Sequence, residues 1–191
     1  MENDITRVLL PEEEIRRGLR RIAERLTKDY QGRELTVVAI LHGSCVFVSD
    51  LIRLLPIPLT LEFLGCSSYG AGTVSSGELK LTFIPGCEDL AGRNVLLVDD
   101  ILDTGRTLYR VREALRARNP ADLKTCVFLD KPARRVVGIV PDYRCFEIED
   151  AFVVGYGLDF AGRYRNLPYL AALKNEVYAA GAPVRGDSAA R

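Results

Sequence analysis

The chain of 191 residues carries no net charge, because its 26 Lys and Arg residues balance 26 Asp and Glu residues, and 48% of it is hydrophobic. This balance excludes a global basic field that would draw the protein to nucleic acid or to an anionic membrane. The length suits one domain with a substantial core. We place that domain at residues 1–178 and expect a disordered tail at residues 179–191.

The termini and cysteines indicate a cytoplasmic protein. Residues 1–4 lack the basic region and following apolar stretch of a secretory signal. No apolar run approaches the ~18 residues of a membrane span. An odd cysteine count without any CxxC pair argues against a disulfide framework and against a structural zinc site. We expect most of them to be small buried apolar residues. They are Cys45, Cys66, Cys87, Cys126 and Cys145.

The first half of the chain predicts two helices and two strands. Apolar residues at helical spacing behind Pro11 and three glutamates predict a helix at residues 11–28. A buried strand follows at residues 36–41. A helix through Leu51 and Leu54 is then ended by Pro56 and Pro58. Alternation predicts a strand at residues 59–64.

Residues 65–77 are too rich in Gly and Ser for regular structure to be expected. Two interpretations remain open for this segment, a mobile lid over a site and a plain surface loop. Long loops in compact domains are often functional, so the sequence alone does not choose between the two.

The second half alternates strands and helices. We expect strands at residues 79–84, 94–98 and 125–129, a helix from Thr107, and a last core strand at residues 152–156. Strands that alternate with helices predict the α/β class, with a mostly parallel sheet covered by helices on both faces.

The run from Val95 to Thr107 carries the most chemical information. A buried strand ends at Asp99 and Asp100, and a Thr/Gly loop then opens a helix. Ligands bind beyond the carboxyl ends of parallel strands, and a helix N-terminus suits a phosphate. Carboxylates beside a phosphate would grip hydroxyls or a metal, so the ligand indicated is a phosphorylated sugar. An apolar run before Asp-Asp also occurs in response-regulator receivers. The specific part is the following Asp-Thr-Gly-Arg-Thr.

This run resembles the phosphoribosyl-diphosphate (PRPP) signature of type I phosphoribosyltransferases. The resemblance implies a mostly parallel central sheet flanked by helices, with a small hood and a flexible loop. It implies that Asp99 and Asp100 hold the ribose hydroxyls and Mg²⁺. The implied 5′-phosphate site comprises Asp103, Thr104, Gly105, Arg106 and Thr107.

Asp103 further resembles the acid of hypoxanthine-guanine phosphoribosyltransferases, which accepts the proton from purine N7 as N9 attacks the sugar. It could instead cap its own loop, and both roles could coexist. Leu41–Ser44 resembles the diphosphate loop of that family, in which the peptide joining the two residues before Gly43 is typically cis. His42 departs from the usual Lys or Arg.

Three other segments extend the resemblance. Ser68 and Tyr69, with residues 73–77, resemble the flexible catalytic loop that closes over the diphosphate. Lys131 resembles the lysine that donates to the 6-oxo group of the base. The C-terminal signature implies four further roles. Phe152 stacks on the purine, Val153 reads it through backbone groups, Asp159 lies near the base and a Mg²⁺, and Arg165 contacts the diphosphate.

The resemblance therefore implies a Mg²⁺-dependent purine-salvage transferase that makes IMP or GMP and diphosphate from PRPP and hypoxanthine or guanine. A xanthine-accepting transferase is the alternative enzyme, because xanthine also has a 6-oxo group, whereas Lys131 argues against adenine. An RNA-binding pyrimidine-operon regulator of the same fold is the alternative from another class. The family forms dimers or tetramers, and the sequence does not choose between them.

Overall fold

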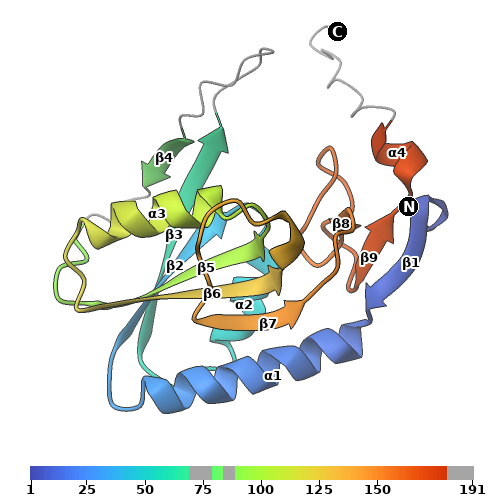
Figure 1. Cartoon of the computed structure of the whole chain (residues 1–191). Helices are drawn as coiled ribbons and strands as arrows, with labels where there is room; N and C mark the ends of the chain where they lie inside the picture. The colour runs from blue at the N-terminus through green and yellow to red at the C-terminus, as the bar shows by residue number, and fades with distance from the viewer. Residues whose placement is uncertain (69–78, 84–88, 180–191) are drawn as a thin grey trace, which may run out of the picture.

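The central element of the fold is a six-stranded sheet with the order β4-β3-β2-β5-β6-β7. A computed structural model describes residues 1–68, 79–83 and 89–179 (Figure 1). All neighbouring strands are parallel except the edge pair β3–β4, so the expected mostly parallel sheet is confirmed. The strands are β2 (Leu35–Leu41), β3 (Leu59–Ser68), β4 (Leu79–Phe83), β5 (Asn94–Leu102), β6 (Asp122–Asp130) and β7 (Tyr143–Glu147).

Helices cover both faces of this sheet. Figure 1 shows α3 (Arg106–Arg116) on one side and α1 (Glu12–Asp29) on the other. The helix α2 (Cys45–Ile52) packs in the same core as α1. Alternate residues of β2 enter the two cores, Val37 beneath α1 and Val38 beneath α3. Strands buried on both faces explain the uninterrupted apolar runs of the sequence.

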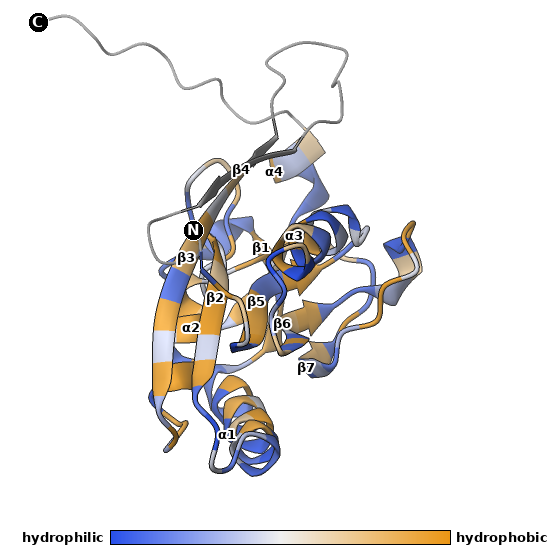
Figure 2. Cartoon of the chain, turned by 90° about the vertical axis from the view of Figure 1, so that its left-hand side faces the viewer, coloured by the Kyte–Doolittle hydropathy of each residue, from blue (hydrophilic) through white to orange (hydrophobic). Residues whose placement is uncertain are grey.

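The two N-terminal helices compare differently with their predictions. The helix α1 begins after Pro11 with glutamates in its first turn, and Ile15, Leu19, Ile22 and Leu26 are buried as the pattern predicts. Figure 2 shows hydrophobic residues on one side of α1 and hydrophilic residues on the other. The helix α2 ends at Ile52, so the predicted extension through Leu54 is wrong. The side chain of Leu54 is exposed.

A second, three-stranded sheet forms the small hood. It pairs β1 (Ile5–Leu10) and β8 (Val153–Val154) with the central β9 (Leu170–Leu173), all antiparallel. The prediction that residues 152–156 form the last core strand is therefore wrong. Gly155 and Tyr156 have positive φ angles, which end β8 after two residues. The unpredicted strand β7 closes the central sheet instead.

Three other boundaries differ from expectation. The strand β3 continues through Gly65 to Ser68, so regular structure extends into the segment expected to be irregular. The strand β5 runs past Asp99 to Leu102. Ala179, expected to begin the tail, is the last residue of α4 (Asn175–Ala179). Residues 69–78, with Tyr69 and most of the predicted lid, and residues 180–191 lie outside the described part of the chain.

The cysteines that the structure describes are free thiols and differ in exposure. Cys126 and Cys145 are buried as expected, Cys66 is partly buried, and Cys45 is exposed, which contradicts the expectation for that residue. Cys87 lies outside the described residues.

Among the helices that the structure describes, none combines the length and apolar character needed to cross a membrane.

Candidate active site

The carboxyl ends of three neighbouring parallel strands bring most of the predicted site residues to one edge of the sheet. His42 and Gly43 follow β2, Asp103 follows β5, and Lys131 follows β6. Leu102 and Asp130 are partners in the parallel pairing and are the last residues of β5 and β6. Asp103 and Lys131 therefore follow these two strands at the same level. This is the edge at which ligands bind in open parallel sheets.

The turn at residues 103–105 has its carbonyl groups fixed by one neighbouring segment. The carbonyl oxygens of Leu102, Asp103 and Thr104 all accept hydrogen bonds from residues 131–137. The donors are the N–H of Lys131 to Leu102 (2.9 Å), Nε of Arg135 to Asp103 (2.9 Å) and the N–H of Val136 to Thr104 (3.0 Å). In a planar trans peptide the N–H points opposite to the C=O. The N–H groups of residues 103–105 therefore point away from residues 131–137.

Among the described residues, these three successive N–H groups are free, because none of them has a hydrogen-bond acceptor. Gly105 is the N-cap of α3 with φ of 85°, a left-handed conformation that glycine adopts without strain. Successive free N–H groups at the start of a helix suit a phosphate. Arg106 and Thr107 are the first residues of α3, so the five residues of the predicted phosphate site span the turn and the start of this helix.

Asp99 and Asp100 form a carboxylate pair within β5, shortly before the strand ends at Leu102. Oδ1 of Asp99 accepts the N–H of Asp100 at 3.1 Å, and Oδ1 of Asp100 accepts the N–H of Ile101 at 2.8 Å. Burial raises the pKa of Asp99 well above its usual range, and the negative charge of Asp100 raises it further. Burial also raises the pKa of Asp100, against the lowering effects of its hydrogen bonds and of Arg165.

Such a pair favours a bound cation or hydroxyl donors, because the two charges are only partly compensated. Mg²⁺ commonly takes one or two carboxylates and completes its shell with water and substrate phosphates, which fits this pair. Among the described residues no three His, Cys, Asp or Glu side chains gather as a metal cluster. The prediction that Asp159 also lies near a metal thus concerns a separate position.

Asp103 presents one free acceptor. Its Oδ1 is buried and has no hydrogen-bond partner among the described residues. Its Oδ2 lies 3.5 Å from Nη1 of Arg134. A buried unpaired carboxylate oxygen is costly, so an N–H or O–H group of a ligand would be stabilised there. This geometry suits the predicted acceptance of a proton.

The loop after β2 contacts the carboxylate pair directly. The peptide between Leu41 and His42 is cis, as the resemblance predicts. A Cβ atom on Gly43 would lie 1.5 Å from Oδ2 of Asp100, so only glycine allows this approach. Gly157 lies against the same loop, because a Cβ atom on Gly157 would come within 2.4 Å of the carbonyl oxygen of Gly43. The side chain of His42 is exposed.

Arg165 and Asp159 form an ion pair beside this loop. Nη2 of Arg165 lies 2.6 Å from Oδ1 of Asp159, and Nη1 donates to the carbonyl oxygen of Gly157 at 2.6 Å. Oδ2 of Asp159 accepts the N–H of Gly162 at 2.8 Å. Arg165 is also close enough to lower the pKa of Asp100, so its positive charge belongs to the same site.

The predicted purine residues lie between β6 and the hood. Nζ of Lys131 is buried, lies 3.0 Å from Oδ1 of Asp150, and donates to the carbonyl oxygen of Ala151 at 3.0 Å. Phe152 is 38% exposed, so part of its ring is open to a ligand. Another part of the ring stacks on Tyr178 of α4, with centroids 4.7 Å apart. Val153 is buried in β8.

Sequence reasoning missed several residues of this region. Asp150 and Tyr178 contact the predicted purine residues, and Arg134 and Arg135 contact Asp103. Adjacent arginines in a loop are indistinguishable in sequence from a solvated surface. The signal that could have found them is their position shortly after Lys131, in the segment that follows a strand ending at the ligand edge.

Comparisons with known proteins identify the family of this chain. The phosphoribosyl transferase domain family matches residues 8–161. A hypoxanthine-guanine phosphoribosyltransferase of Streptococcus pneumoniae is 44% identical over 178 residues, covering 93% of this chain and 98% of the relative. One from Staphylococcus aureus is 45% identical over 178 residues, covering 93% and 99%.

Comparison with a solved structure shows the same fold in a related protein. The crystal structure of a hypoxanthine phosphoribosyltransferase from Staphylococcus aureus superposes with a TM-score of 0.87 at 45% identity, covering 93% of this chain and 96% of that one. The family match spans more than half of the chain, and it includes β5 and the turn at residues 103–105. The chain therefore belongs to the phosphoribosyltransferase family.

Proposed function

We propose that this protein is a purine-salvage enzyme that transfers the 5-phosphoribosyl group of PRPP to N9 of hypoxanthine or guanine. A bond forms between N9 and C1′ of the ribose, and the bond from C1′ to the diphosphate oxygen breaks. The diphosphate leaves with the electron pair, and the second product is IMP or GMP. Family membership and the names of the relatives support this reaction and favour neither the xanthine nor the RNA-binding alternative.

The ribose 5-phosphate part of PRPP binds between the carboxyl end of β5 and the N-terminus of α3. The N–H groups of residues 103–105, with Arg106 and Thr107, bind the 5′-phosphate. Asp99 and Asp100 accept hydrogen bonds from the 2′- and 3′-hydroxyls of the ribose. Positioning of this kind supplies much of the rate enhancement in transfer between two bound substrates.

The leaving diphosphate is bound on the other side of the carboxylate pair. Arg165 contacts its oxygens through the guanidinium, and the backbone at His42 and Gly43 donates to it. Ser68 and Tyr69 close over the diphosphate and exclude water from the reacting ribose. The side chain of Ser68 and the whole of Tyr69 lie outside the described residues, so their part depends on the resemblance alone.

Mg²⁺ is the cofactor that the carboxylate pair fits. Asp99 and Asp100 would hold Mg²⁺, and Asp159 would lie near a Mg²⁺ through its water ligands. When bound, Mg²⁺ neutralises the negative charge of the diphosphate.

The purine is recognised by four residues. Lys131 donates to the 6-oxo oxygen, Phe152 stacks on the ring, and Val153 and Asp159 line the remaining edge of the base. Asp103 accepts the proton from N7 through its unpartnered Oδ1 as N9 attacks C1′. That oxygen beside a row of free N–H groups is the observation that carries the proposal.

A PRPP-dependent assay with hypoxanthine, guanine, xanthine and adenine tests this function. We expect nucleotide formation with hypoxanthine, guanine or both, and none with adenine. Formation of XMP alone would replace this proposal with the xanthine enzyme, and no product with any base would refute it. We also propose a homodimer or homotetramer on family resemblance, which light scattering after size-exclusion chromatography measures.

A further inference from the structure

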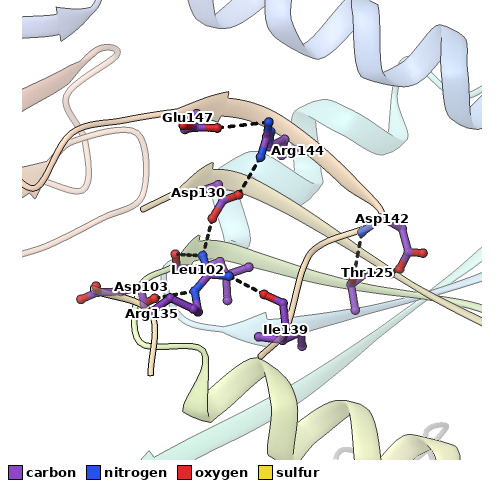
Figure 3. Close-up of polar contacts among 9 residues, drawn as sticks. All are labelled: Leu102, Asp103, Thr125, Asp130, Arg135, Ile139, Asp142, Arg144 and Glu147. Atoms are coloured by element: carbon purple, nitrogen blue, oxygen red, sulfur yellow. Dashed lines mark hydrogen bonds and ion pairs between the residues drawn. The ribbon is translucent and has the colours of Figure 1, made fainter. Parts of the chain in front are cut away.

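We propose that Arg135 is a positioning residue for phosphoribosyl transfer, because its guanidinium holds the phosphate-binding turn in its anion-binding conformation. This inference rests on the proposed function. Arg135 lies outside every motif of the sequence, and its guanidinium contacts the backbone of the turn rather than a side chain that we assign to a substrate. Figure 3 shows its side chain among the carbonyl groups of the turn and the carboxylate of Asp130.

The guanidinium of Arg135 contacts four oxygen atoms from three parts of the chain. Nε donates to the carbonyl oxygen of Asp103 at 2.9 Å, and Nη2 donates to that of Leu102 at 3.1 Å. Nη1 donates to the carbonyl oxygen of Ile139, and Nη2 also donates to Oδ1 of Asp130. Only the planar fork of arginine carries donors in enough directions to serve all of these acceptors.

These contacts determine the direction of the N–H groups that bind phosphate. The carbonyls of Leu102 and Asp103 point toward Arg135, so the N–H groups of Asp103 and Thr104 point the opposite way, toward the ligand side. Without the guanidinium, the carbonyl of Asp103 would lose its one donor among the described residues and could rotate toward water, taking the N–H of Thr104 with it. The carbonyl of Leu102 would keep the N–H of Lys131, at 2.9 Å. The same backbone carries the side chain of Asp103, so its orientation depends on Arg135 as well.

Packing and charge hold Arg135 itself in place. Its side chain is 15% exposed, and that of Asp130 is 4% exposed. A Cβ atom on Gly105 would lie 3.0 Å from Cδ of Arg135, so the aliphatic part of the arginine packs directly against the left-handed glycine of the turn. The carboxylate of Asp130 compensates the buried positive charge, which would otherwise be strongly destabilising.

Arg144 provides a matched control because it shares Asp130 but not the turn. Nη1 of Arg144 lies 3.1 Å from Oδ2 of Asp130, and Nη2 lies 3.1 Å from Oε2 of Glu147 on β7. Figure 3 shows Arg144 on the side of Asp130 that faces away from Leu102 and Asp103. Loss of Arg144 therefore removes an ion pair of the same carboxylate without releasing a carbonyl of the turn.

The test compares Arg135→Lys with Arg144→Ala. Lysine keeps the charge beside Asp130, but its single ammonium group cannot serve all of the carbonyl oxygens together. We expect Arg135→Lys to raise KM for PRPP about tenfold or more and to weaken binding of ribose 5-phosphate in proportion, since small misplacements of a site cost up to ~100-fold. We expect KM for hypoxanthine to stay within about twofold. Arg144→Ala should leave all three constants unchanged.

Several outcomes would overturn the proposal. If Arg135→Lys lowers Tm but leaves KM for PRPP and the ribose 5-phosphate affinity as in the parent, Arg135 only stabilises the fold. If Arg135→Lys does not fold, Asp130→Asn tests the claim through the partner, because it keeps an oxygen acceptor but removes the compensating charge. A raised KM for PRPP then supports the proposal, and an unchanged one refutes it.

An inactive parent that still binds ribose 5-phosphate would refute the proposed function. The role of Arg135 would then be tested by the affinity of each variant for ribose 5-phosphate.

Discussion

Asp103 has two carboxylate oxygens in different surroundings, and the difference predicts what its replacement does. Oδ2 lies 3.5 Å from Nη1 of Arg134, whereas Oδ1 is buried and has no partner within the described part of the chain. Asp103→Asn keeps the shape and the carbonyl oxygen but removes the carboxylate that we propose takes the proton. We predict that kcat falls by about 10²–10⁴-fold, the usual contribution of general base catalysis, while KM for PRPP changes little. Steady-state kinetics with hypoxanthine measures both constants.

A carboxylate on the helix that follows the turn serves as the control. Glu113 lies on α3 and pairs with Arg116 at 3.1 Å, away from the turn. Glu113→Gln makes the same chemical change as Asp103→Asn and should leave kcat unchanged. If Asp103→Asn retained the kcat of the parent, Asp103 would act only as a cap of its own loop.

Asp99 illustrates a conflict between stability and function at a single residue. Burial raises its pKa, so the folded protein binds more protons than the unfolded chain at pH values between about 4 and the raised pKa of the folded state. Stability from this group is therefore lost as the pH rises through that window. We predict that Asp99→Asn, which removes the buried ionisable group, raises Tm of the ligand-free protein. The expected rise is about 2–4 °C for each kcal/mol by which the free energy of unfolding increases.

The pH dependence separates this cause from a general packing effect. The Tm difference between Asp99→Asn and the parent should be larger at pH 8 than at pH 4, because the parent carboxyl is neutral at the lower pH. The variant should also lose the stabilisation that Mg²⁺ and PRPP give to the parent. Thermal scans with and without both ligands measure these differences. An equal Tm difference at both pH values would contradict the explanation.

At the scale of elements, the contact between two loops predicts the effect of a glycine replacement. Gly157 and Gly92 both have positive φ angles, of 97° and 71°, so alanine strains the backbone similarly at each. Only at Gly157 would the new Cβ meet the carbonyl oxygen of Gly43, at 2.4 Å. We predict that both variants lose stability, and that only Gly157→Ala raises the inhibition constant of diphosphate. Equal inhibition constants would mean that Gly157 does not position the diphosphate loop.

The elements that sequence analysis predicted are those specified by local patterns. The helix α1 has apolar residues at the helical period, and the strands β2 and β5 are short uninterrupted apolar runs, which are typical of strands buried on both faces. The strands β1 and β9 are paired between opposite ends of the chain, Ile5 with Leu173, and no local pattern records such a pairing. The strand β8 has two residues, too few for a period.

The same distinction explains which site residues were predictable. Residues 99–107 are contiguous, so their chemistry can be interpreted from the sequence. Arg135 acts on carbonyl groups 32 and 33 residues earlier in the chain. Every residue has a carbonyl group, so no pattern of side chains indicates that partnership. Such positioning groups become visible only when the backbone of the site is known.

For the whole molecule, the two sheets predict unequal local stability. The strands β2, β5 and β6 each have a neighbour on both sides and helices over both faces. The hood has only three strands, and β1 and β8 are its edges. Small sheets with exposed edges open at lower free energy than a buried sheet centre. We predict that amide hydrogen exchange is slowest in β2, β5 and β6 and faster in β1, β8 and β9.

Ligands should change this exchange pattern in a way that separates the two halves of the site. IMP would engage Phe152 and Val153 of the hood through its base as well as the turn at residues 103–105 through its phosphate. We predict that IMP slows exchange in β8 and β9, because binding to the closed form raises the free energy of opening. Inorganic phosphate fills only the turn, so it should protect the start of α3 and leave the hood unchanged. Equal protection of the hood by both ligands would show that the phosphate site alone controls its opening, and that the base makes no stabilising contact with β8.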